Sequence, residues 1–146
     1  MHSRNFADTG ARIPTYITGE DTLSIEVLLD RNSPEWRWLA SIYDRLHDTV
    51  SAERAKLAIA IFPLAYQLNE GYPFFPQKQL ASYCRENSIP CLDLLPAFRK
   101  QSKEDIFVLD KEGRDDIWHL TDSGHKLSAE EIRRFLQEQE LLPTNR

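Results

Sequence analysis

The feature that most constrains the fold is an unbroken apolar run, Leu57-Ala58-Ile59-Ala60-Ile61-Phe62, which Pro63 terminates. A half-exposed strand alternates apolar and polar residues, whereas a strand covered on both faces is apolar throughout. Strands of the second kind belong to parallel sheets that carry helices on both faces. Residues 57–62 therefore predict a buried strand of an α/β fold.

A helix is predicted directly before this strand. Ser33 can cap the free amides, Pro34 suits the first helical position, and Glu35 suits the positive end of the helix dipole. Apolar residues then recur at steps of three and four, which predicts one buried stripe. The stripe, expected to pack on the sheet, consists of Trp36, Leu39, Tyr43, Leu46 and Val50.

A second helix and a second strand follow. Pro76 opens the helix and Asn87 is a stop signal. The inward positions of this helix are Leu80, Ala81 and Cys84. Residues 89–96 read as a second short buried strand, in which backbone amides at the strand end are expected to hold Asp93.

A polar connection is expected over residues 98–110, with a short apolar piece at 106–109. The last predicted helix begins after Thr121, a capping residue, and runs to about Leu141. Its inward face is expected to hold Ala129, Ile132, Phe135 and Leu136.

The alternation of helices and strands specifies crossover connections and a parallel sheet. Residues 1–146 are expected to form a single domain, in which residues 1–20 are an irregular lead-in and residues 22–29 are a weak candidate strand. Two or three strands make a narrow sheet for so much helix. The chain therefore resembles the second half of a doubly wound α/β domain, apparently lacking the N-terminal strands. An uncovered edge of such a sheet is also a surface for self-association.

Composition narrows the function classes. Of the 146 residues, 41% are hydrophobic and 28% charged, which is typical of a globular protein and not of a disordered one. The net charge of −5 and the scattered lysines and arginines argue against a nucleic-acid partner. The sequence has neither an apolar run of membrane-spanning length nor a signal-peptide core, so a cytoplasmic location is expected. Cys84 and Cys91 are expected to be reduced thiols, although a disulfide between them stays open.

Candidate chemistry lies in residues 115–125. Asp116 precedes His119 by three residues, in what we expect to be a polar turn. A histidine that accepts a proton at neutral pH needs a neighbour that fixes its tautomer and stabilises its charged form, and an aspartate can do both. Asp116 and His119 are therefore the candidate catalytic pair. A metal site that adds Asp122 and His125 is a weaker hypothesis, because one loop would supply every ligand.

A candidate substrate pocket follows the first strand. Residues 64–75 form the loop at the carboxyl end of that strand, where open α/β sheets bind ligands. The pocket candidates on this loop are Tyr66, Gln67, Tyr72 and Phe74. The alternative is that these side chains simply pack the loop down, and the sequence leaves both readings open.

Together these segments resemble the C-terminal half of the SGNH (GDSL-type) hydrolases. The resemblance covers roughly residues 56–136 and rests on the strand at 89–96 and on the pattern Asp-x-x-His-Leu-Thr-x-x-Gly-His that starts at Asp116. It implies a flavodoxin-like three-layer α/β/α sandwich with a parallel sheet. It also implies a cofactor-free ester hydrolase of the Ser-His-Asp type that acts on acyl or acetyl esters of small molecules, lipids or carbohydrates. Asp116 and His119 match the Asp and His of the family.

The sequence departs from the family at the nucleophile. No Gly-Asp-Ser occurs in the chain, and no Gly-x-Asn-Asp of an oxyanion hole. Ser3 has no strand before it, so it does not match the family's serine. The serine would therefore come from residues or a chain outside this sequence. The alternative function is a non-catalytic α/β module that acts in binding or assembly.

Overall fold

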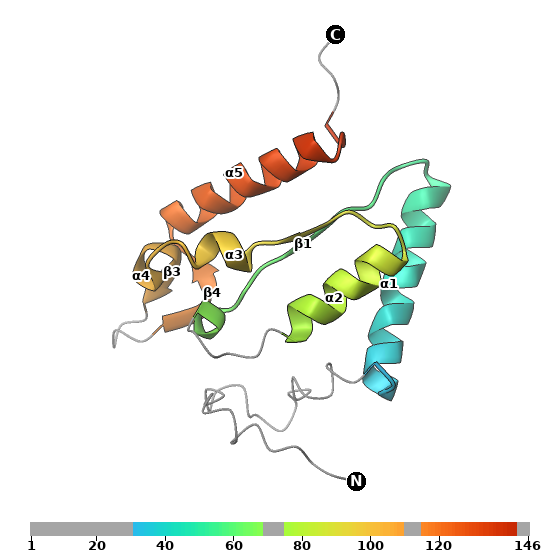
Figure 1. Ribbon diagram of the computed structural model, residues 1–146, viewed down its shortest axis with the longest axis horizontal. Coiled ribbons are helices and arrows are strands. Elements are labelled where there is room, and N and C mark those ends of the chain that lie inside the picture. The colour runs from blue at the N-terminus through green and yellow to red at the C-terminus, as the bar shows by residue number, and fades with distance from the viewer. Residues whose placement is uncertain (1–30, 69–74, 110–114, 143–146) are drawn as a thin grey trace.

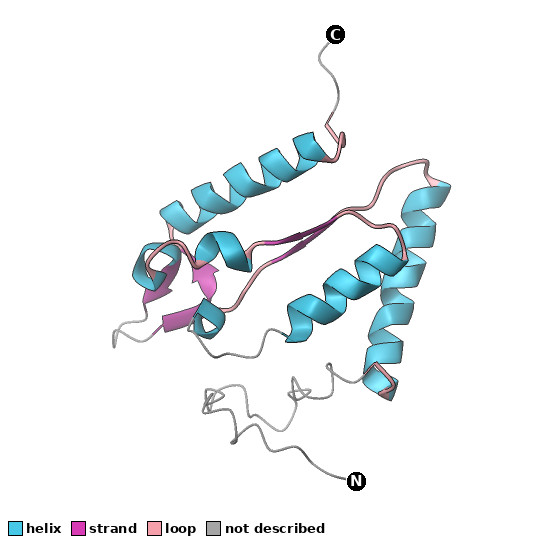
Figure 2. Ribbon diagram, viewed as in Figure 1, coloured by secondary structure: helices cyan, strands magenta, loops and turns pink. Residues whose placement is uncertain are grey.

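The computed structural model describes residues 31–68, 75–109 and 115–142. These residues form a mixed α/β structure that is mostly helical, with two pairs of short strands (Figures 1 and 2). The elements are α1 (Pro34–Ala52), β1 (Ile59–Ile61), η4 (Ala65–Leu68), α2 (Phe75–Glu86), β2 (Cys91–Asp93), α3 (Leu95–Phe98), α4 (Lys103–Ile106), β3 (Phe107–Leu109), β4 (Asp115–Leu120) and α5 (Asp122–Glu138).

Helix α1 begins as the sequence predicts. The hydroxyl of Ser33 accepts a hydrogen bond from the N–H of Trp36 at 2.9 Å, and Pro34 is the first helical residue. Trp36 is buried, but Leu46 is 44% exposed, so the predicted inward position of Leu46 is wrong. Helix α1 packs mainly on α2 and on the segment that leads into β1. Leu46 lies at the edge of the apolar stripe, outside this contact.

Strands β1 and β2 pair in parallel, with Ile59 opposite Cys91 and Ile61 opposite Asp93. This confirms the predicted pair of parallel strands. Figure 1 shows α5 on one side of β1, and α2 and α1 on the other. The expectation of full burial on both faces is wrong, however, because Ala60 and Phe62 are exposed. In the described part of the chain this sheet has only two strands, too few for the helices to cover both faces.

Strand β2 is shorter than predicted. The carboxylate of Asp93 accepts the N–H of Leu95 at 3.0 Å, which confirms its expected role at the strand end. The chain then turns directly into α3, so the predicted continuation of the strand to Pro96 is wrong. Burial raises the pKa of the Asp93 carboxyl, and the hydrogen bond from Leu95 opposes this shift.

The predicted polar connection and the predicted polar turn both contain regular structure. Residues 98–110 include α4 and β3, and the turn expected at residues 115–119 is instead strand β4, which pairs antiparallel with β3. Both predictions are corrected, because such short elements are stabilised by pairing between strands and leave no local periodicity in the sequence.

Helix α5 begins at the predicted cap and ends slightly early, at Glu138. Phe135 is buried, as predicted, whereas Ala129 is exposed, so that inward position is wrong. Gly124 and Ser128 are buried in its place, because α5 packs its first turns on α3 and α4. None of the helices within the described ranges combines the length and apolar character needed to cross a bilayer.

Buried side chains form two hydrophobic clusters. One joins α1 and α2 through Trp36, Tyr83, Cys84 and Ile89, with Leu57 and Ile59 packed against it. The other joins η4, α3, α4 and β3, with Leu120 and Leu127 packed against it; its buried members are Ala65, Tyr66, Leu94, Phe98, Ile106 and Phe107. The second cluster lies at the carboxyl end of β1 (Figure 1) and supports the segment that carries His119.

The α/β class is thus established, while the flavodoxin-like three-layer sandwich stays a prediction. The candidate strand at residues 22–29 and the lead-in at residues 1–20 lie outside the described residues. Self-association through the sheet edge likewise stays a prediction.

Each long helix in the described ranges, α1, α2 and α5, ends at a residue in the left-handed conformation, and none of these residues is glycine. They are Arg54, Ser88 and Glu140, with φ between 53° and 56°. At the end of α5, the N–H of Glu140 bonds to the carbonyl of Gln137 and the N–H of Leu141 to that of Leu136. This pair of bonds is the Schellman motif, in which glycine is preferred because a Cβ atom is strained at positive φ.

We predict that Glu140→Gly stabilises the protein by about 0.5–1 kcal/mol, because it removes this strain. The matched control is Glu130→Gly in the exposed middle of α5, which should destabilise it by about 1 kcal/mol. Urea unfolding of both variants measures the difference. Equal destabilisation by both substitutions would contradict the proposed strain at Glu140.

Candidate active site

His119 lies at the end of β4, two residues before the cap of α5. Its side chain is exposed. The sheet β3–β4 lies beyond the carboxyl end of β1, and η4, which follows β1, contacts β4 (Figure 1). The structure therefore brings the predicted histidine to the same end of the molecule as the predicted pocket loop. The side chain of Asp116 lies outside the described residues, so a hydrogen bond between Asp116 and His119 stays a prediction.

The backbone that carries these two residues is not a regular strand. Phe107 pairs with Leu120 and Leu109 pairs with Asp115, so β4 spans five residue steps where β3 spans two. The irregularity includes residues 116–119. In a regular strand, residues three apart face opposite sides of the sheet, which would separate an Asp-x-x-His pair. A bulge removes that restriction, and bulges frequently re-aim side chains next to active sites.

Thr121 fixes the position of His119 relative to α5. Its N–H donates to the carbonyl of Ile106 at 2.9 Å, and its hydroxyl donates to the carbonyl of Asp105. The same hydroxyl accepts the N–H of Gly124 at 3.1 Å and so caps the helix. One side chain therefore ties the end of β4, the start of α5 and the α4–β3 junction together.

Gly124 allows the first turn of α5 to lie directly on the α4–β3 junction. A Cβ atom at this position would collide with the carbonyl oxygen of Ile106 and would come within 3.1 Å of the Cβ of Leu120. The hydroxyl of Ser128 donates to the carbonyl of Gly124 at 2.8 Å, deeper along the same contact. Thr121 and Gly124, two residues of the family-like pattern, thus have structural roles in this chain.

The pocket candidates have different surroundings. Tyr66 is buried in the cluster with Leu94 and Phe98. The side chain of Gln67 is also buried, and its Oε1 accepts a hydrogen bond from the N–H of Leu64. Tyr72 and Phe74 lie outside the described residues. Tyr66 and Gln67 therefore face the protein interior. Both belong to η4, which contacts β4.

A buried pair of amides holds η4 to α2. Gln67 and Gln77 exchange two hydrogen bonds, at 3.2 and 3.0 Å, and the Oε1 of Gln67 also accepts the N–H of Leu64 at 2.7 Å. The guanidinium of Arg99 donates to the backbone carbonyl of Gln67 at 3.4 Å. Sequence reasoning missed Gln77. The only available signal was a second glutamine in the first turns of a helix otherwise read from its apolar positions.

The metal hypothesis gains no support from the described residues. They include no group of three or more His, Cys, Asp or Glu side chains placed to hold a metal ion. The metal hypothesis also includes Asp116, whose side chain lies outside the described residues. A shallow depression lined by Lys56, Ala58, Leu136 and Leu141 lies at the far end of α5, roughly 25 Å along the helix from His119.

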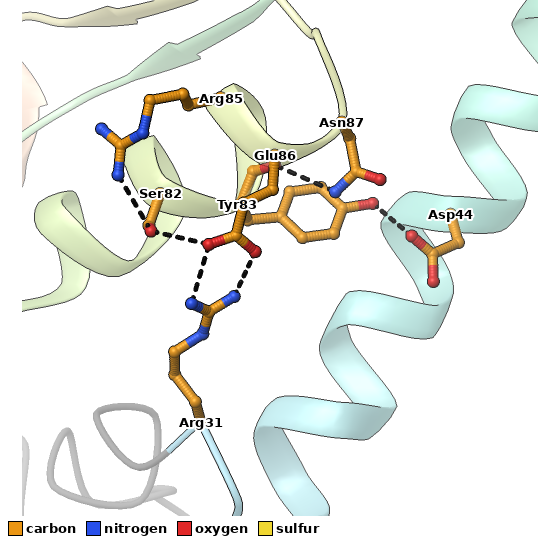
Figure 3. A network of polar contacts seen from close by, with 7 residues as sticks. All are labelled: Arg31, Asp44, Ser82, Tyr83, Arg85, Glu86 and Asn87. Carbon is orange, nitrogen blue, oxygen red and sulfur yellow. Dashed lines mark hydrogen bonds and ion pairs between the residues drawn. The ribbon is translucent and has the colours of Figure 1, made fainter.

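A second polar cluster joins α1 and α2 (Figure 3). The hydroxyl of Tyr83 donates to the carboxylate of Asp44 at 2.6 Å, and burial followed by this bond raises the Tyr83 pKa. Arg31 forms a bidentate pair with Glu86, whose carboxylate also accepts a hydrogen bond from Ser82 at 3.0 Å. These contacts lie away from His119 and hold α1 and the turn before it against α2, so we assign them a structural role.

The two cysteines are free thiols, as expected. Cys84 is buried and Cys91 packs against the same cluster. Burial is the main cause that raises the pKa of both thiols, that of Cys91 to about 12. Since the thiolate is the reactive form, neither cysteine has the properties of a nucleophile at neutral pH.

Comparisons of the chain with protein-family models, with curated proteins and with solved structures find no significant match. Evidence for function therefore comes from the residues of this chain and their geometry.

We predict that Gly124→Ala destabilises the protein by about 1–3 kcal/mol, because the added methyl group must displace backbone. Ser123→Ala is the control at the exposed neighbouring position and should change stability by less than about 0.5 kcal/mol. Thermal unfolding followed by circular dichroism distinguishes the two. A neutral Gly124→Ala would show that α5 does not approach Ile106 so closely.

The Arg31–Glu86 pair predicts a pH dependence. The hydrogen bonds from Arg31, with a smaller one from Ser82, lower the pKa of Glu86 from 4.5 to about 2. A lowered pKa in the folded state stabilises the protein above pH 4.5, and this contribution is lost as the pH falls through about 2. Glu86→Gln should therefore lower the melting temperature at pH 7 and have progressively less effect as the pH falls through about 2.

The effect should be small and weakened by salt, because both partners are about half exposed. Glu130→Gln is the control, since Glu130 is exposed and has no ion pair within the described residues. A melting-temperature difference for Glu86→Gln that does not change between pH 7 and pH 2 would rule out this linkage.

Proposed function

We propose that this chain is the C-terminal portion of an SGNH-type ester hydrolase, with His119 as general base. The observation that carries the proposal is the exposed His119 at the end of an irregular strand, beside the capped start of α5 and beyond the carboxyl end of β1. Ligands of parallel α/β sheets bind at that end.

In this proposal the nucleophile is a serine from outside the chain. His119 takes the proton of the serine hydroxyl as the oxygen attacks the ester carbonyl, and then gives the proton to the leaving alcohol. Asp116 orients the imidazole and stabilises its protonated form. Donors for the oxyanion would come from the same source as the serine, since the sequence lacks the family's oxyanion motif.

The same proposal includes a flavodoxin-like three-layer sandwich. Its support is the parallel β1–β2 pair, which has helices on both sides but leaves Ala60 and Phe62 exposed. Additional strands beside β1 would cover these residues. The substrate class, acyl or acetyl esters of small molecules, lipids or carbohydrates, follows from the resemblance.

One observation favours a second candidate function, a non-catalytic α/β module. Tyr66 and Gln67, the described pocket candidates, make contacts within the protein and are buried. A module that has lost its serine would keep such packing and would need no substrate cavity at this place.

We predict that the isolated chain hydrolyses p-nitrophenyl acetate no faster than free imidazole at equal concentration. Loss of a catalytic serine costs roughly 10⁶ in rate in serine hydrolases that have been dissected by mutation. A version extended upstream with a strand and Gly-Asp-Ser should be active and should react with a fluorophosphonate probe. His119→Ala should abolish that activity.

The matched control is His125→Ala, which removes another exposed histidine on the first turn of α5 and should leave most of the activity. An extended chain without activity would favour the non-catalytic module. Labelling of a serine in the short chain, with turnover that requires His119, would show that the nucleophile is already present.

A further inference from the structure

Helix α1 carries more apolar surface than its neighbours cover. Its inner face packs on α2 and on the segment before β1 through Trp36, Leu39 and Tyr43. A second row of large apolar side chains points elsewhere and is exposed, at 63% for Trp38, 40% for Ile42 and 44% for Leu46. At about 100° per residue the two rows together span roughly 160° of the helix circumference, and the outer half of this arc is exposed. A helix this broadly apolar has a second partner or a cost in solubility.

Two members of the exposed row, here called the outer stripe (Trp38, Ile42 and Leu46), lie at core positions of a helix-pairing seam, and Leu46 lies beside that seam. Residues Glu35, Trp38, Ile42 and Arg45 recur at alternating steps of three and four, which is the repeat of coiled-coil core positions. Coiled-coil core positions are of two kinds, a and d. When two such helices pair antiparallel, each a position faces a d position of the partner helix. Trp38 then lies opposite the partner's Ile42, twice by symmetry.

Charge complementarity selects a second copy of this chain as the partner. In the same antiparallel register Glu35 lies opposite the partner's Arg45, so that one ion pair closes each end of the apolar layers. Neither Glu35 nor Arg45 has a side-chain ion pair within the described part of the chain. A parallel pairing would instead place Glu35 beside the partner's Glu35, and like charges oppose that arrangement.

We propose that the outer stripe of α1 is a homodimer interface, in which two copies of α1 pack antiparallel around a two-fold axis between Trp38 and Ile42. Such an interface is isologous, because each copy offers the same surface and receives the same surface. The stripe is small compared with the roughly 800 Å² per partner of a standard interface. The dimer is therefore expected to be in equilibrium with monomer at micromolar concentrations. This inference does not depend on the proposed ester hydrolase function.

Sedimentation velocity over a concentration series tests the association. The unmodified chain should change from monomer to dimer, and Ile42→Glu should remain monomeric over the same range. Val108→Glu and Leu142→Glu are the controls, since both residues are exposed apolar side chains (39% each) outside α1. These control variants should dimerise like the unmodified chain.

Charge reversal tests the register. Glu35→Arg and Arg45→Glu should each raise the dissociation constant about tenfold or more, because each places like charges across the interface. The double variant Glu35→Arg/Arg45→Glu should restore the dimer. Far-UV circular dichroism verifies that each variant keeps its helix content, because the charge reversals should change the dissociation constant of the dimer and leave the folding of the monomer unchanged.

A chain that stays monomeric at the highest concentration overturns the proposal, as does a dimer that Ile42→Glu leaves unchanged. A dimer lost in Val108→Glu but kept in Ile42→Glu would place the interface elsewhere and also overturn it. Failure of the double charge reversal to restore a dimer that each single reversal weakens would overturn the antiparallel register.

Discussion

The contact between the first turn of α5 and the α4–β3 junction determines the arrangement around His119. Gly124 gives this contact its closeness, because a side chain there would meet the carbonyl oxygen of Ile106. Thr121 gives it direction through hydrogen bonds to the carbonyl groups of Asp105 and Ile106. Backbone groups cannot move away independently as the end of a flexible side chain can, so this junction holds β4 and α5 in one relative orientation.

The position of His119 is therefore determined by segments that are distant in sequence. Leu120 packs against the cluster of Tyr66, Leu94 and Phe98, which places the end of β4 beside η4 and α3. The irregular pairing of β4 with β3 then sets the backbone around residues 116–119. The packing of Leu120 and the β3–β4 pairing together form a rigid frame around the exposed His119. A catalytic base requires such a rigid frame.

Local signals in the sequence were sufficient for the helix starts but not for the short strands. Ser33 and Thr121 were predicted correctly because a cap depends on the few residues that follow it. Leu46 and Ala129 were misplaced because periodicity defines an apolar face without showing how much of it a neighbour covers. Strands β3 and β4 were missed because each is stabilised by pairing with the other and is too short for a periodic signal. The candidate histidine was found from a motif, whereas the Gln67–Gln77 pair leaves no periodic signal.

The division of the interior into two hydrophobic clusters has a consequence for dynamics. The cluster of Trp36 and Tyr83 involves α1, α2 and the start of both parallel strands, whereas the cluster of Phe98 and Phe107 involves the elements around β4. Within the described residues they are linked by the short β1–β2 pair, with Cys91 in one cluster and Leu92 in the other, and by the Gln67–Gln77 hydrogen bonds between η4 and α2. Sub-global opening follows such boundaries, so each cluster is expected to act as a separate cooperative unit. The segment around His119 can then open and close, and its amide hydrogens can exchange with solvent, while α1 and α2 remain folded.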